Sequence, residues 1–134
     1  MFRNGSAQYK TMWSSSTGAH TVKETGGIGN AWKRAGYEKG WGWPTTDERS
    51  VPGGAYQMFR NGSAQYRTLW SVRTGAHSVK ETGGIGNAWK RAGYEKGWGW
   101  PTTEEHRSGG EIQQKFSNGV TAHWTAQRGV WTTR

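Results

Sequence analysis

A repeat of 57 residues constrains this chain more than any other feature of its sequence. Residues 1–46 align with residues 58–103 without a gap, and these two copies differ at only five positions. A shorter third copy begins at Phe116, where Phe-Ser-Asn-Gly corresponds to the Phe-Arg-Asn-Gly of the first two copies. Because so short a unit cannot cover its own apolar face, neighbouring copies are expected to stack or to close into a ring.

Each copy predicts the same order of elements. In the second copy, residues 55–59 and 64–70 are typical of two strands joined by an Asn-Gly turn. A short helix follows, with Thr82 as its N-cap and Gly93 as its left-handed C-terminal cap. Its apolar stripe has the helical spacing of Ile85, Ala88, Trp89 and Ala92. Residues 94–105 complete the copy as a loop.

The predicted fold is therefore mainly β with short helices, in tandem repeats of β-hairpin, short helix and long loop. The arrangement of the units is expected to be propeller-like or ring-forming. One structural domain is predicted from three units: residues 1–57, residues 58–114, and a partial third unit at residues 115–134 that holds a hairpin only.

The core of this chain is expected to be aromatic. Only 31% of the residues are apolar, yet ten are tryptophan, a frequency that also argues against disorder. Trp32 and Trp89 lie on the helical stripe and are predicted to be buried. The aromatic residues of the hairpins are predicted to join them, namely Phe2, Trp13, Phe59 and Trp70.

The sequence Gly-Trp-Gly-Trp-Pro occurs once in each of the first two copies. Its first tryptophan, Trp41 or Trp98, is assigned to the core. Its second tryptophan, Trp43 or Trp100, is open to two interpretations. One is burial, and the other is a platform on which the C–H groups of a sugar ring stack.

No catalytic or metal site is predicted. The adjacent acids Asp47-Glu48 and Glu104-Glu105 tend to point apart on an extended loop, which makes a poor acid–base pair. His20 and His77 each stand without a second ligand at metal spacing, and the chain has no cysteine. The Thr-Gly-Gly-Ile-Gly segment lacks the flanking residues of a nucleotide site, so close helix packing is its expected role. No cofactor is expected, and duplication of the unit favours binding through avidity.

The charge of the chain bears on its partners. A net charge of +9 predicts attraction to polyanions, but no motif indicates recognition of nucleic acid. No apolar run is long enough to span a bilayer. No signal peptide is present in the sequence, so export would require a leader that has been removed or that lay on a larger precursor.

Several motifs in order resemble the LGFP repeat family. The family pattern combines an aromatic-x-x-Gly hairpin, a Trp-Ser…Thr-Gly-Ala-His segment, an Ile-x-x-x-Trp helix and a Gly-x-Leu-Gly-Phe/Tyr-Pro-Thr loop. The corresponding residues here are Phe59…Gly62, Trp70-Ser71…Thr74-Gly75-Ala76-His77, Ile85…Trp89 and Gly97-Trp98-Gly99-Trp100-Pro101-Thr102. The same elements occur 57 residues earlier, with tryptophan at both variable positions of the loop.

The resemblance implies a function as well as a fold. LGFP repeats occur in tandem on actinobacterial cell-wall enzymes, such as mycoloyltransferases and peptidoglycan hydrolases, where they form a propeller-like disc that attaches the enzyme to the wall. It implies a secreted, non-catalytic module that binds peptidoglycan or arabinogalactan. The predicted contacts are Trp43, Trp100, Tyr37, Tyr94, His20 and His77. The alternative is a scaffold in which a homo-oligomer completes the ring, and a nucleic-acid-binding module is a third hypothesis.

Overall fold

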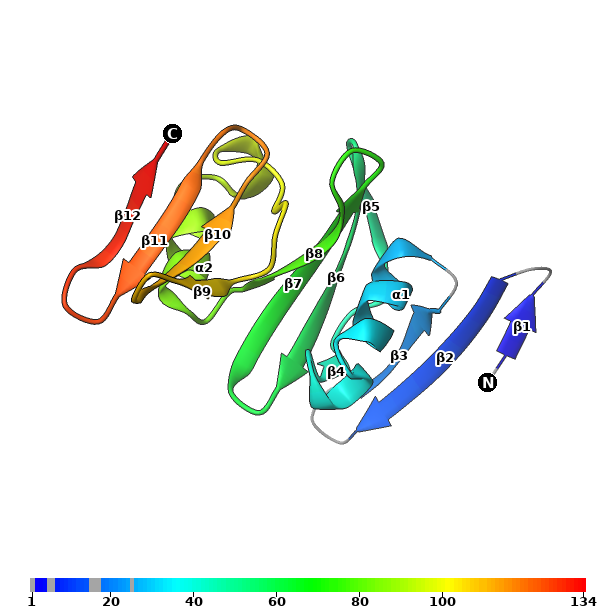
Figure 1. Ribbon diagram of the computed structural model, residues 1–134. Coiled ribbons are helices and arrows are strands. Elements are labelled where there is room, and N and C mark those ends of the chain that lie inside the picture. Colours follow the sequence, from blue (N-terminus) through cyan, green and yellow to red (C-terminus); the bar gives the residue numbers. More distant parts are fainter. Residues whose placement is uncertain (1, 5–6, 15–17, 25) are drawn as a thin grey trace.

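Three antiparallel sheets and two short helices alternate along the chain (Figure 1). The computed structural model describes residues 2–4, 7–14, 18–24 and 26–134, with side chains from residue 10 onward except that of Ser14. The first sheet has the order β1 (Phe2–Asn4), β2 (Ala7–Ser14), β3 (Gly18–Lys23). The second has the order β4 (Trp43–Pro44), β6 (Gly54–Asn61), β7 (Ala64–Ser71), β8 (Gly75–Lys80), and β5 (Arg49–Val51) pairs with β6. The third has the order β12 (Gly129–Thr133), β11 (Thr121–Thr125), β10 (Glu111–Lys115), β9 (His106–Ser108).

Each helix lies between two consecutive sheets. Helix α1 (Gly27–Arg34) contacts β3 of the first sheet and both β7 and β8 of the second. Helix α2 (Gly84–Arg91) contacts β8 of the second sheet and both β11 and β12 of the third. Short 3-10 turns, η1 (Tyr37–Lys39) and η2 (Tyr94–Lys96), follow the two helices. The copies therefore stack in line, as Figure 1 shows.

The predicted class, mainly β with short helices in repeated units, is confirmed. The propeller-like or ring-forming arrangement is not: among the strands that the structure describes, none closes a sheet or forms a propeller. The physical reason is that each helix is covered on opposite sides by the sheets before and after it, so the units add along a line.

Two hydrophobic clusters fill the spaces on either side of the second sheet. The first core consists of Met12, Val22, Ile28, Ala31, Trp32, Trp41, Ala55 and Phe59. The second core consists of Leu69, Val79, Ile85, Trp89, Phe116, Val120 and Ala122. Each cluster combines the helix of one copy with a phenylalanine from the next copy, so consecutive copies share each core.

The local elements follow the sequence, with two corrections at the helix ends. The predicted hairpin and helix of the second copy are β6–β7 and α2, and Gly93 has the predicted left-handed φ of +105°. The N-cap is Gly83 rather than Thr82, whose hydroxyl instead accepts a hydrogen bond from Gln65 N at 3.3 Å. Ala92 is the exposed C-cap of the helix and does not join the stripe.

Most of the predicted core aromatics are buried. Trp32, Trp89 and Phe59 are fully enclosed and Trp41 is buried, while Trp98 is half-buried against the second core. The side chain of Phe2 lies outside the described residues.

Trp13 is the exception, because it is 65% exposed. Its counterparts Trp70 and Trp124 are half-buried because they lie against the first helical glycine of the preceding copy. A Cβ at Gly27 would lie 2.1 Å from the Trp70 ring, and one at Gly84 would lie 2.5 Å from the Trp124 ring. Close packing, the expected role of these glycine-rich segments, is therefore confirmed.

Candidate functional site

Tryptophan and phenylalanine join consecutive copies at the centre of each core. The Trp32 ring stacks on Phe59 of the next copy with centroids 6.0 Å apart, and its indole N–H donates to the Gly42 carbonyl at 3.1 Å. The second junction repeats this arrangement, with Trp89 on Phe116 at 6.2 Å. The same side chain thus fixes both the next hairpin and the loop of its own copy.

The Gly-Trp-Gly-Trp-Pro loop is bound to the hairpin that follows it. Trp43 and Pro44 form strand β4, which pairs with Arg60 and Phe59 of β6. Gly42 has a φ of +92°, and a Cβ there would lie 1.8 Å from the Arg60 carbonyl oxygen. The segment predicted to be a loop is therefore partly an added strand of the next sheet, because its central glycine allows the two backbones to touch.

The tyrosines among the predicted contact residues pack on the core tryptophans. Tyr37 and Tyr94 are half-buried and have left-handed φ values of 59° and 60°. Their rings meet Trp32 and Trp89 edge-on at 5.0 and 5.1 Å. A cation from a hairpin also lies over each ring, Lys10 Nζ at 4.5 Å from Tyr37 and the Arg67 guanidinium at 4.7 Å from Tyr94.

The other four predicted contact residues are distributed over separate places. Trp43 packs against the first core and Trp100 against the second, and both are half-buried. His20 lies 3.6 Å from Asp47, and His77 lies 3.1 Å from Glu104. The structure does not gather the six around one pocket, and their contact with a ligand stays a prediction.

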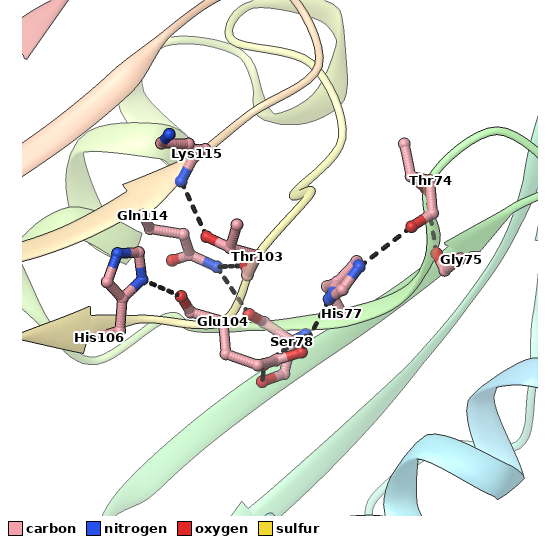
Figure 2. Close-up of polar contacts among 9 residues, drawn as sticks. All are labelled: Thr74, Gly75, His77, Ser78, Thr103, Glu104, His106, Gln114 and Lys115. Atoms are coloured by element: carbon pink, nitrogen blue, oxygen red, sulfur yellow. Dashed lines mark hydrogen bonds and ion pairs between the residues drawn. The ribbon is translucent and has the colours of Figure 1, made fainter.

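The edge strand of each helix-bearing copy is capped by the loop and the strand that follow. In Figure 2, the Ser78 N–H of β8 donates to Glu104 Oε2 at 3.0 Å, and the Ser78 carbonyl accepts from Gln114 Nε2 at 2.8 Å. In β3, the Thr21 N–H donates to Asp47 Oδ1 at 2.9 Å, and Gln57 Nε2 donates to the Thr21 carbonyl at 3.0 Å. The first acid of each acidic pair is therefore a structural partner of a strand edge.

The two glutamines were missed by the sequence reasoning. Gln57 and Gln114 are fully buried, and each donates a second hydrogen bond at 2.9 Å to a loop carbonyl, that of Thr46 or Thr103. The sequence did contain a signal for this role. Gln57 and Gln114 lie one repeat period apart, although the residues that follow them, Met58 and Lys115, differ.

We expect Gln57→Leu to lower the free energy of unfolding by about 2–4 kcal/mol, because two carbonyls lose their donor. Urea denaturation measures the loss. Gln114→Leu should give a similar value, whereas Gln127→Leu, at an exposed position, should stay within about 0.5 kcal/mol of the parent chain. Equal small losses at Gln57 and Gln127 would contradict this role.

The same surface cavity occurs beside both helices. In the second copy it measures about 190 Å³ and is lined by Lys80, Gly83, Gly84, Ile85, Glu105, Ile112 and Trp124. In the first copy it measures about 220 Å³ and is lined by Lys23, Gly26, Gly27, Ile28, Glu48 and Trp70. Each cavity thus has an indole wall from one copy and a lysine and a glutamate from the copy before. Such a combination of a flat apolar face and polar groups is suited to binding small polar ligands.

Burial raises the pKa of the Glu105 carboxyl, and the nearby Lys80 charge partly lowers it again. A carboxyl with a raised pKa destabilises the folded state at pH values where it is ionised. We therefore expect Glu105→Gln to raise the free energy of unfolding at neutral pH. The difference in the free energy of unfolding between the variant and the parent chain should disappear as the pH falls below the ordinary glutamate pKa. The gain is small because much of this side chain is exposed. Urea denaturation at several pH values tests it, and a difference that is constant with pH would contradict it.

Two other kinds of feature are absent from the described residues. No group of three His, Asp or Glu side chains there is placed to hold a metal ion. None of the helices described has the length and apolar character needed to cross a membrane.

The comparisons with known proteins agree with the repeated architecture. The family model described as the LGFP repeat matches residues 1–40 and 42–97. This is a repeat family, and no catalytic domain is identified. No curated protein matches the chain. Since the two matches cover most of the sequence, the chain belongs to the LGFP repeat family.

Proposed function

We propose that this chain is a non-catalytic, extracellular module that attaches to cell-wall polysaccharide, either peptidoglycan or arabinogalactan. The observation that carries the proposal is the recurrence of the cavity walled by Trp70 in the first copy and by Trp124 in the second. Two equivalent sites on one chain raise the avidity for a polymer that repeats its own epitope. Membership of the LGFP family, with its tandem units, supports the same function.

The cavity has the chemistry that a sugar requires. An indole face accepts the C–H side of a pyranose or furanose ring. The ammonium of Lys80 donates hydrogen bonds, and the carboxylate of Glu105 accepts them from hydroxyl groups. Gly83 and Gly84 also line the cavity, and Gly84 allows the Trp124 indole to lie against the start of the helix.

The six residues predicted from the sequence as ligand contacts differ in how well the structure supports that role. His77 lines a cavity at the junction of the first two copies, together with Arg34 and Glu104. Trp43, Trp100, Tyr37 and Tyr94 pack against the two cores, as Trp70 and Trp124 also do. Of these six aromatic residues, Trp70 and Trp124 are the ones that line the recurring cavity. The geometry therefore favours Trp70 and Trp124 as the principal aromatic contacts.

Retention on insoluble wall material tests the proposal. The parent chain should sediment with purified actinobacterial wall fractions at physiological salt. A variant that removes both polar pairs without changing the net charge, Lys23→Met, Glu48→Gln, Lys80→Met and Glu105→Gln, should remain in solution. The matched control changes Glu38, Lys39, Glu95 and Lys96 in the same way and should sediment normally. Failure of the parent chain to sediment would overturn the proposal.

Self-assembly is a second candidate, favoured by one observation. Trp13 exposes 65% of its surface, and Val72 exposes 86%. Trp70 and Trp124 each lie against a helical glycine of the preceding copy, so the exposed Trp13 is suited to the same kind of contact with another chain. If such contacts drive assembly, light scattering should show a mass above that of one chain, and Trp13→Ser should restore the monomer. A monomeric parent chain that binds wall material would exclude this function.

A further inference from the structure

The cavity at Trp124 is the first of three neighbouring cavities. Lys80 and Glu105 also line a second cavity of about 350 Å³, between Tyr66 of β7 and the loop that follows α1. A third cavity of about 300 Å³ shares Trp41 with the second and ends at His77. Neighbouring cavities in this row of three have wall residues in common, and we call the row the junction groove.

The first copy repeats the central part of this groove. Lys23 and Glu48 line both the cavity at Trp70 and an adjoining cavity of about 300 Å³, just as Lys80 and Glu105 do 57 residues later. That adjoining cavity also contains Thr21 and Asp47, the counterparts of Ser78 and Glu104. A lysine and a glutamate between two cavities are thus a property of the repeat.

The capping of strand β8 argues against an extended peptide as the occupant. β8 is an edge strand, and its residue Ser78 lines the junction groove. A peptide that adds to a sheet must pair with the free N–H and C=O groups of such an edge. Both groups of Ser78 are already bonded, to Glu104 and to Gln114 (Figure 2). Strand addition is therefore blocked at this point of the groove.

The charges of the groove argue against a polyanion. Its cations, Arg34 and Lys80, are opposed by the carboxylates of Glu104 and Glu105, and His77 is held by Glu104. The net charge of +9 is therefore not concentrated in the groove. Paired charges of opposite sign suit a neutral ligand that has both hydrogen-bond donors and acceptors, as a chain of hydroxyl groups does.

We propose that the junction groove binds several consecutive residues of a linear, uncharged polysaccharide chain, with Lys80 and Glu105 at its centre and the Trp124 indole at one end. This inference rests on the proposed function and specifies its ligand. The general basic charge of the chain then acts on the approach to an anionic wall, while the groove selects neutral segments of the wall polymer.

Titration calorimetry with neutral galactan and arabinan oligosaccharides of increasing length tests the inference. Affinity should rise from the disaccharide over several sugar units and should not change between low and high salt. Lys80→Met with Glu105→Gln should weaken binding of the longest oligosaccharide tenfold or more, while Lys96→Met with Glu95→Gln should leave it unchanged. Arg34→Gln, at an exposed position of the groove, is a second variant that tests the same loss of binding. The equivalent Arg91→Gln is its control.

The outcomes separate this inference from the proposed function. Equal affinity for the disaccharide and the longest oligosaccharide, or loss of binding at high salt, would overturn the groove as the site of a neutral chain. Sedimentation with wall material but no binding of any neutral oligosaccharide would also overturn it, and would leave the proposed function standing. Thermal unfolding of each variant excludes loss of folding as the cause.

Discussion

We expect Gly42→Ala to lower the free energy of unfolding by more than about 4 kcal/mol. The new methyl group would lie 1.8 Å from the Arg60 carbonyl oxygen, which belongs to the backbone of the next copy and cannot turn aside. The φ of +92° adds the cost of a left-handed conformation for a residue with a Cβ. The loop and β6 would have to separate, which breaks the pairing of β4 with β6.

Gly62→Ala is the matched control for this prediction. Gly62 also has a positive φ, +61°, but a Cβ there would meet no atom within 4 Å. Its substitution should therefore cost only the conformational term of about 1–2 kcal/mol. Denaturation in urea compares the two variants directly. Equal losses would show that the left-handed backbone alone, and not the contact between copies, makes Gly42 necessary.

We expect Phe59→Ala to cost about 3–5 kcal/mol, because a fully buried ring is replaced by a methyl group. Phe59 contacts two tryptophans of the preceding copy, Trp32 at 6.0 Å and Trp41 at 5.5 Å between centroids. The cavity therefore opens between the copies. The Trp41 and Trp32 indoles should become more accessible, which fluorescence quenching by iodide or acrylamide measures.

Phe116→Ala provides the control, because Phe116 has the same role at the next junction. Both variants should lose a similar amount of stability and differ only in which tryptophans become accessible. If Phe59→Ala instead costs less than about 1 kcal/mol, the shared core is not a principal source of stability.

The sequence was sufficient for the local elements because each of them depends on neighbouring residues. The Asn-Gly turn between β6 and β7, the stripe of Ile85 and Trp89, and the left-handed Gly93 depend on short-range periodicity and on turn chemistry. The stacking of copies also follows from the repeat, since one copy lacks enough apolar residues to form a core.

The failures concern contacts between copies or between separate elements of one copy. Trp13 and Trp70 occupy the same position of the repeat, but only Trp70 lies against the helix of an earlier copy, so position in the repeat does not separate them. Thr82 is a good N-cap by type, yet Gly83 takes that position, and the Thr82 hydroxyl accepts a hydrogen bond from Gln65 N of β7 instead. The arrangement of the copies in a line rather than in a ring likewise depends on contacts between copies, because it follows from which sheets cover each helix.

The candidate site was predicted only in part. Tandem duplication pointed to binding and the tryptophans to a sugar, but the predicted contacts were aromatic residues of the loop together with His20 and His77. The cavities instead combine Lys80 and Glu105 of one copy with Trp124 of the next, which are distant in sequence and have no common motif. A surface assembled across a repeat boundary is not visible in the sequence of a single repeat.

Consecutive copies jointly build each core, and with it the cavities between them. The most direct test is the indole N–H signals in a proton–nitrogen correlation spectrum of two conservative variants. Phe59→Leu should shift the signal of Trp32, in the copy before it, and leave that of Trp89 in place. Phe116→Leu should do the reverse, moving Trp89 and leaving Trp32 unchanged. A shift of Trp89 by Phe59→Leu, with Trp32 unmoved, would place each core within a single copy and would contradict the account.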